Sequence, residues 1–226
     1  MRPNKPNEVL AKRLITQVQG AFDRGDLHMA HRSLCDGWKG RDLIDLLEHP
    51  SAAVRKLAVM SLALVGDSAA VGPLACVLHD ETPGLNDAAD NALMCIWARA
   101  GRRQSGMFLK NGSQHLNHGN IEAAIEKFSM AIQADSDFAE AYHQRSIAYS
   151  MAERYAEAIK DCNEVLARVP QHFMAMAGLG HCHTSMGDFD GARRYYRLAL
   201  AINPGMTALE EALRDLTELL GPAEAA

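Results

Sequence analysis

Two pairs of histidines are the residues whose type and spacing could do chemistry. The chain has ten histidines in 226 residues, among them the pairs in HLNH (His115 and His118) and in HCH (His181 and His183). A spacing of three residues places two imidazoles on one face of a helix, as metal ligation would need. No carboxylate or thiol stands at a matching spacing, so we expect no metal and no cofactor. The simpler interpretation is that His115 and His183 pack between helices and that His118 is exposed near a turn.

Catalytic motifs are a second possible source of chemistry, and the sequence offers none. It contains no Gly-rich phosphate loop, no GxSxG elbow and no HExxH zinc motif. The loops that the pattern predicts are short, and catalytic groups usually stand on loops held by a scaffold. We therefore predict no catalytic residues and no enzymatic activity.

Composition and charge restrict the function classes further. The chain is 48% hydrophobic and 23% charged, as folded globular proteins are, and its net charge is −5. No basic stripe stands out, so we predict no nucleic-acid binding. No stretch approaches the roughly 18 apolar residues of a membrane span, and the start lacks the apolar run of a signal peptide. The five cysteines form no CxxC pair, which predicts reduced, mostly buried thiols and a cytoplasmic location.

The elements that must position these residues follow a 34-residue repeat. YAEAIKDCNEVLARVP begins at Tyr155, and a relative of it, FDGARRYYRLALAINP, begins at Phe189. Each copy predicts a helix, a short turn and a second helix, and the copies stack because one hairpin cannot bury its own apolar face. The recurring positions are the small residues Gly112, Ser146 and Gly180, then Ala124, Ala158 and Ala192, the turn residues Gly119, Glu153 and Gly187, and the ends Ser136, Pro170 and Pro204.

This pattern resembles the tetratricopeptide repeat family, in three consecutive copies over residues 105–206. The resemblance implies an all-α fold, an α-solenoid of stacked helical hairpins. Arg145 and Asn111 depart from it, because the family usually has leucine there. The amphipathic stretch Thr207–Leu220 is predicted to cap the open end of the stack. Residues 105–226 should therefore form one domain.

A second, 31-residue period lies upstream, over about residues 43–101. Its two copies are LIDLLEHPSAAVRKLAVMSLALVG, which begins at Leu43, and LACVLHDETPGLNDAADNALMCIW, which begins at Leu74. They are similar to the short form of the HEAT-like helical repeat. Residues 7–38 read as a helical hairpin, whose first helix should bury a stripe of Val9, Leu10, Leu14, Ile15 and Val18. Residues 1–104 are thus predicted as a separate domain, with the boundary in the basic, glycine-bearing segment 98–106.

The tetratricopeptide resemblance also implies a concave groove, lined by the first helix of each hairpin, that binds a peptide or helix of a partner protein. The positions that would carry lysine, asparagine and arginine in members that clamp a chaperone's C-terminal carboxylate hold Leu109, Ser113, Gln144, Met174 and Gly178. A buried carboxylate would be unpaired there, so we expect an apolar or mixed partner segment. The alternative is that nothing binds, or that the C-terminal helix fills the groove. The predicted groove residues are Leu109, Ser113, Leu116, Asn117, Glu140, His143, Ile147, Ser150, Met151, Met174, Ala177, His181, Thr184 and Ser185.

The functional prediction is a non-catalytic scaffold or adaptor for protein–protein interaction. Two alternatives stay open. One is a small HEAT-repeat enzyme or enzyme subunit, because short HEAT-like repeats also occur in lyases that attach bilin pigments to proteins. The other is a structural homo-oligomer joined through uncapped solenoid ends.

Overall fold

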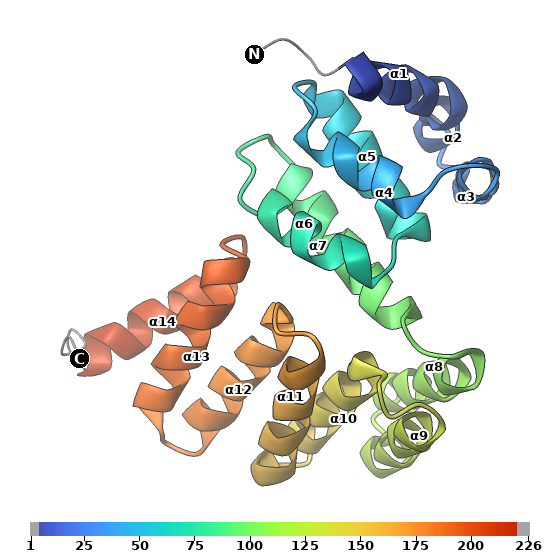
Figure 1. The fold of residues 1–226 in the computed structure, drawn as a ribbon. Helices are drawn as coiled ribbons and strands as arrows, with labels where there is room; N and C mark the ends of the chain where they lie inside the picture. The colour runs from blue at the N-terminus through green and yellow to red at the C-terminus, as the bar shows by residue number, and fades with distance from the viewer. Residues whose placement is uncertain (1–4, 221–226) are drawn as a thin grey trace. The chain divides into compact units, whose positions relative to one another are not determined.

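The computed structural model describes residues 5–220, and every regular element in that range is a helix (Figure 1). The predicted all-α fold is therefore confirmed. No helix in this range is long and apolar enough to cross a membrane. The chain divides into two compact units, the first ending at Trp97 and the second beginning at Ala98. The predicted boundary, at residues 104 and 105, lies a few residues further along, in the first turn of α8 (Arg103–Asn117).

The first unit is a series of helical pairs. Its elements are α1 (Lys5–Leu14), the π-helical turn η1 (Ile15–Gln19), α2 (Gly20–Asp23), α3 (Leu27–Cys35), α4 (Gly40–Ile44), η2 (Asp45–Glu48), α5 (Ala52–Val65), η3 (Ser68–Ala70), α6 (Val71–Val77) and α7 (Leu85–Arg99). Each copy of the 31-residue period holds a short helical segment followed by a longer helix. The HEAT-like character of these pairs remains a prediction.

The N-terminal helix buries less of its predicted stripe than expected. Leu14 and Val18 are fully buried, but Val9 is 69% exposed and Ile15 is 42% exposed. The π-helical turn over Ile15–Gln19 explains part of this difference, because its wider turn shifts the angular position of every residue after Leu14. A stripe drawn at a constant 3.6-residue period cannot anticipate that shift.

The prediction of mostly buried cysteines is wrong. Cys162 and Cys182 are buried, whereas Cys35, Cys76 and Cys95 are exposed, and all five are free thiols. Helical periodicity accounts for the exposed ones. Cys95, for example, stands two residues from each of the buried Leu93 and Trp97, which places it about 200° around α7 from both.

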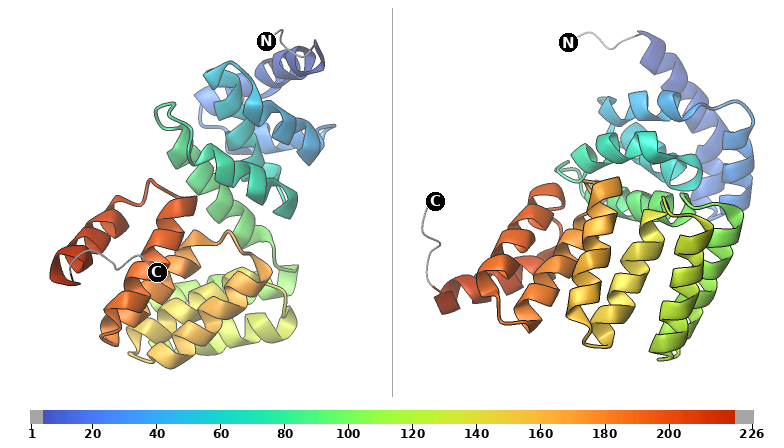
Figure 2. Two further views of the ribbon diagram at one scale, coloured as in Figure 1. Left: turned by 60° about the vertical axis from the view of Figure 1, so that its left-hand side comes forward. Right: turned by 60° about the horizontal axis from the view of Figure 1, so that its bottom comes forward.

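The second unit is a row of helical hairpins closed by a last helix (Figure 2, right). After α8 come α9 (Ile121–Ala134), α10 (Ala139–Met151), α11 (Tyr155–Arg168), α12 (Phe173–Ser185), α13 (Phe189–Ile202) and α14 (Thr207–Leu220). The most extensive contacts join helices that follow one another in the chain. The predicted C-terminal helix packs on α13 and buries Leu209 and Leu216.

Small residues in this unit lie where the two helices of a hairpin come closest. A Cβ atom on Gly112 of α8 would stand 2.5 Å from the ring of Phe128 in α9. A Cβ atom on Gly180 of α12 would overlap the ring of Tyr196 in α13. The repeat predicts small residues at both positions, and the structure gives the reason: each aromatic ring lies against bare backbone.

The turns between paired helices share one backbone conformation. Gly119, Glu153 and Gly187, which occupy the same position in successive repeats, have φ values of 76°, 59° and 77°. This left-handed region suits glycine and is unfavourable for other L-residues by about 1–2 kcal/mol. Glu153 is the one non-glycine residue with positive φ among the described residues.

Glu153→Gly is therefore expected to raise the free energy of unfolding of the second unit by about 0.5 kcal/mol. The relief of backbone strain exceeds the extra chain entropy that glycine adds to the unfolded state. All five tyrosines lie in this unit, so tyrosine fluorescence during urea denaturation would follow it. Glu153→Ala is the matched control and should not stabilise. Equal stability of the two variants would contradict the strain argument.

Candidate functional site

A hollow of about 320 Å³ lies in the second unit, between the first helices of two neighbouring hairpins. Most of its wall comes from α10 and α12, and α11 and the residues just before α14 complete it. The lining residues are His143, Ser146, Ile147, Ser150, Met151, Cys162, Met174, Ala177, Gly178, His181, Cys182 and Met206. None of them is a lysine, arginine, aspartate or glutamate, so the hollow offers apolar surface with hydroxyl and imidazole groups.

Several predicted groove residues meet in this hollow. They are His143, Ile147, Ser150, Met151, Met174, Ala177 and His181. Met151 is 53% exposed, and Ile147 and Met174 are half-buried, so apolar atoms remain open to a ligand. Methionine adapts its shape to different partners because its side chain is unbranched and polarizable.

The two cysteines of the hollow add to its apolar character. Burial raises the pKa of the Cys162 thiol to about 12, and burial also raises the pKa of Cys182. Both thiols are therefore protonated at neutral pH and behave as small apolar groups.

The predicted residues from α8 do not join this hollow. Leu109 is buried in a core cluster with Ala124 and Phe128, and Leu116 packs against the same cluster. Ser113 donates its hydroxyl hydrogen to the Leu109 carbonyl at 3.1 Å, and Asn117 is exposed. The apolar side chains Leu109 and Leu116 of α8 thus pack against α9 within their own hairpin.

Three further predicted residues also lie outside the hollow. The hydroxyl of Thr184 donates to the Gly180 carbonyl at 3.0 Å and contacts the Tyr196 hydroxyl at 3.1 Å, and Ser185 is exposed. Glu140 is buried, with 5% of its surface exposed. These three residues present little or no apolar surface to a ligand in the hollow.

The structure brings together one group that sequence reasoning missed, namely Glu140, His143 and His172. Their nitrogen and carboxylate oxygen atoms all lie within 4.8 Å of one another, and all three residues are buried. Glu140 and His143 are one turn apart on α10, a spacing visible in the sequence. His172 is the residue before α12 and comes more than twenty positions later, so spacing alone gives no signal for it.

The two histidine pairs that the sequence singled out do not act as pairs. His118 contacts the Gln114 carbonyl at 2.7 Å, and His183 contacts Asp188 at 2.7 Å. His181 contacts the Tyr196 hydroxyl at 2.9 Å. Within residues 5–220, the one group of three or more potential metal ligands is the cluster around Glu140.

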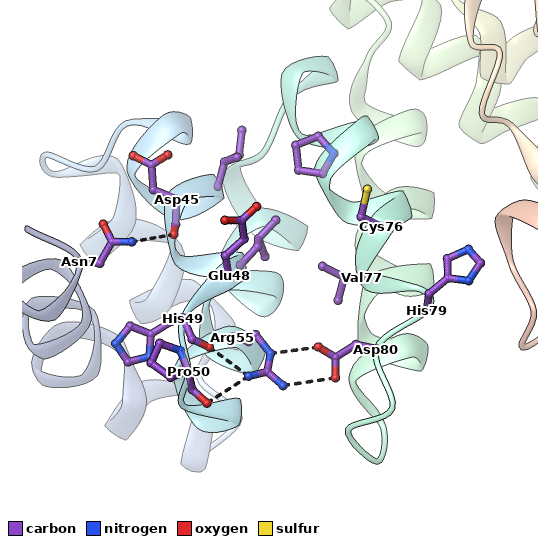
Figure 3. Close-up of a pocket in the computed structure, with 13 residues that line it drawn as sticks. Asn7, Asp45, Glu48, His49, Pro50, Arg55, Cys76, Val77, His79 and Asp80 are labelled. Atoms are coloured by element: carbon purple, nitrogen blue, oxygen red, sulfur yellow. Dashed lines mark hydrogen bonds and ion pairs between the residues drawn. The ribbon is translucent and has the colours of Figure 1, made fainter. Parts of the chain in front are cut away.

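A larger hollow, of about 930 Å³, lies in the first unit between η2 with its connection to α5 and α6 with its connection to α7 (Figure 3). Arg55 occupies one side of it and joins these two connections. Its guanidinium donates to Asp80 at 3.0 and 3.2 Å, to Thr82 at 2.7 Å and to the His49 carbonyl at 3.0 Å. This cation is fully engaged within the protein, which indicates a structural role.

The stability of the first unit is expected to depend on pH through Asp80. Hydrogen bonds from Thr82, with a further contribution from Arg55, hold the pKa of Asp80 below its usual value. A lowered pKa stabilises the fold above the pKa of the unfolded chain, and the contribution is lost as pH falls through the folded-state pKa. Wild type should therefore be more stable than Asp80→Asn at pH 7, and this difference should shrink below about pH 4.

Tryptophan fluorescence measures that difference selectively, because both tryptophans, Trp38 and Trp97, lie in the first unit. Urea denaturation of wild type and Asp80→Asn at pH 7 and pH 3 gives the comparison. Asp67→Asn, at a carboxylate that caps η3, is a control for general loss of negative charge. An equal difference at both pH values would contradict the assignment to Asp80.

Comparisons with known proteins match part of the second unit to a family. Residues 137–204, which hold the second and third copies of the repeat, match the model described as Tetratricopeptide repeat. DnaJ homolog subfamily C member 3 of Gallus gallus is 31% identical over 110 residues, which is 49% of this chain and 22% of that protein. Heat shock protein STI1 of Saccharomyces cerevisiae is 27% identical over 107 residues, covering 47% of this chain and 18% of that protein. The chain thus spans about a fifth of the length of these relatives.

Solved structures show the same fold for the second unit. The first TPR of Spaghetti (RPAP3), bound to HSP90 peptide SRMEEVD, superposes with a TM-score of 0.52 at 20% identity, over 53% of this chain and 95% of that chain. The Sgt2 TPR domain from Aspergillus fumigatus gives a TM-score of 0.51 at 20% identity, over 56% of this chain and 91% of that one. The tetratricopeptide likeness is therefore confirmed for residues 137–204, and the HEAT-like likeness remains untested.

Proposed function

We propose that the protein is a non-catalytic adaptor, and that the hollow between α10 and α12 binds a segment of a partner protein. The observation that carries the proposal is the uncharged, partly exposed lining of this hollow, which Ile147, Met151 and Met174 dominate. It lies on the first helices of hairpins whose fold matches TPR domains, and one of the matching domains was solved with a peptide. Binding would lay apolar side chains of the partner into a preformed groove.

The proposed partner segment is apolar or mixed, and it differs from the peptide of that neighbour. SRMEEVD carries two glutamates and a terminal aspartate. The hollow has no lysine or arginine to pair with such carboxylates, and an unpaired carboxylate in an apolar site costs several kcal/mol. An amphipathic helix, or an extended segment with leucine or methionine side chains, fits the lining better.

The cytoplasm is the proposed location. All five cysteines are free, including the exposed Cys35, Cys76 and Cys95. Exposed free thiols persist most readily in a reducing compartment.

The test is a capture experiment with wild type and Ile147→Glu, in lysate of the source organism, followed by mass spectrometry of the retained proteins. Burying the new carboxylate under an apolar ligand should remove binding, which we expect to fall at least a hundredfold, to background. Leu198→Glu is the matched control, because Leu198 is 43% exposed on α13, outside the hollow. Circular dichroism should show native helicity for both variants.

A protein retained by wild type and by Leu198→Glu, but lost with Ile147→Glu, would support the groove as the binding site. Its affinity should then be measured with the purified partner segment. Equal recovery with all three proteins would refute binding in this hollow and move the functional surface to the first unit or to the outer helices.

A further inference from the structure

The cluster of Glu140, His143 and His172 lies beside the proposed groove, and His143 belongs to both. His143 Nδ1 stands 3.4 Å from Glu140 Oε1, and His172 Nε2 stands 3.4 Å from Glu140 Oε2. The two imidazole centroids are 4.6 Å apart. Exposed fractions are 5% for Glu140, 3% for His143 and 0% for His172, so the three polar groups face one another away from solvent.

The charge of Glu140 requires a partner. Asp161, a buried acid in the middle of α11, forms an ion pair with Arg145. Glu140 has no such cation: within the described part of the chain, its side chain contacts the two imidazoles and the Gln144 amide, which donates to Oε1 at 2.7 Å. Buried charges in proteins are normally paired or bound to metal.

The distances from the two imidazole nitrogens to the Glu140 carboxylate are also long for hydrogen bonds. Charge-assisted hydrogen bonds from nitrogen to a carboxylate are about 2.7–2.9 Å long, whereas both contacts of Glu140 with histidine are 3.4 Å. Ligand atoms placed tetrahedrally at about 2.0–2.2 Å from a zinc ion stand roughly 3.3–3.6 Å from one another. The two 3.4 Å separations, one to each carboxylate oxygen, fall in that range, and the ligand atoms as a set lie within 4.8 Å of one another.

We propose that Glu140, His143 and His172 form a binding site for a divalent transition-metal ion of the zinc class. Two imidazoles and one carboxylate are a common ligand set for such ions, with a fourth position left for water or another ligand. His143 also lines the hollow, which gives the ion a route from solvent. Gln144 would hold the carboxylate in place from outside the ligand set.

Metal binding would change the tautomer of His172. Without an ion, Nδ1 accepts the Ala175 amide hydrogen at 3.2 Å, so the ring proton is on Nε2 and points at Glu140. Coordination through Nε2 moves the ring proton to Nδ1 and breaks that contact. The Ala175 amide keeps its second bond, to the His172 carbonyl at 3.0 Å, so the first turn of α12 is retained.

The experiment is a calorimetric titration of Zn²⁺ into the chelator-treated 226-residue chain, repeated with Co²⁺ to record the visible absorption of a four-coordinate site. We expect one ion per chain, with an affinity at least tenfold weaker in His143→Gln and in His172→Asn. Asparagine can still cap α12, so His172→Asn removes the ligand and keeps the cap. His181→Asn is the control, because His181 lines the same hollow outside the cluster.

The variant Gln144→Ala distinguishes metal binding at this cluster from nonspecific metal binding by other histidines of the chain. It should keep the stoichiometry of one ion and weaken the affinity by about tenfold or more, as expected for a residue that orients a ligand. Two results would overturn the proposal: no saturable binding by natively helical wild type, or binding that the cluster variants leave unchanged. Neither result depends on the partner segment, so the adaptor proposal is tested independently by the capture experiment.

Discussion

Gly180→Ala, which adds one methyl group, is expected to lower the free energy of unfolding of the second unit by about 2 kcal/mol. The new Cβ atom would overlap two carbons of the Tyr196 ring. That ring cannot turn away easily, since it is 2% exposed and its hydroxyl contacts Thr184 and His181. Overpacking of this kind costs about 1–3 kcal/mol or more, and the helix preference of alanine offsets only part of it.

The measurement for Gly180→Ala is urea denaturation followed by tyrosine fluorescence. Gly106→Ala provides the control, because Gly106 is also helical and no atom would lie within 4 Å of a Cβ added there. That variant should gain about 0.5–1 kcal/mol from helix preference alone. If Gly180→Ala proved as stable as Gly106→Ala, the close approach of α12 to Tyr196 would be wrong.

Removing the Asp161 carboxylate should have the larger effect, a loss of about 3 kcal/mol or more in Asp161→Ala. Arg145 donates to both carboxylate oxygens, at 2.7 and 2.8 Å, and to the Ser129 hydroxyl at 3.0 Å, so it connects α9, α10 and α11. Burial alone would lower the pKa of Arg145, but Asp161 outweighs that effect and raises it. The variant leaves this largely buried guanidinium without its counter-charge.

The double variant Arg145→Leu with Asp161→Leu tests whether the loss comes from the unpaired charge. An apolar pair of similar volume often replaces a buried ion pair without cost, so we expect stability within about 1 kcal/mol of wild type. Stability would be measured by the same denaturation assay. A double variant less stable than Asp161→Ala would show that Arg145 contributes through contacts other than its charge.

The repeat made much of the second unit predictable from the sequence. A 34-residue period specifies both the hairpins and the positions of close approach, because Gly112 and Gly180 recur for the same packing reason. It also located the turn at Glu153, where glutamate replaces the glycine found in the other two copies. The period could not show that Leu109 and Leu116 pack into the core. Their helix, α8, is the first of the row, and its apolar side chains pack against α9.

The missed features have different physical origins. The cluster around Glu140 depends on how α12 begins, and His172 reaches Glu140 across an inter-repeat contact that no local spacing encodes. The exposure of Ile15 follows from a π-helical turn, which has no clear sequence signature here. Seven of the twelve residues that line the candidate site, including Ile147 and Met174, could be placed by resemblance, because equivalent positions of neighbouring repeats face the same side.

The succession of contacts along the second unit also has a kinetic consequence. Its most extensive helix–helix contacts join neighbours in the chain, from α8 with α9 to α13 with α14. Folding can therefore start at any hairpin and spread outward without first closing a long loop. Amide hydrogen exchange should then be graded along the row and fastest in α14, because that helix is covered mainly by α13 and opens without disturbing the others.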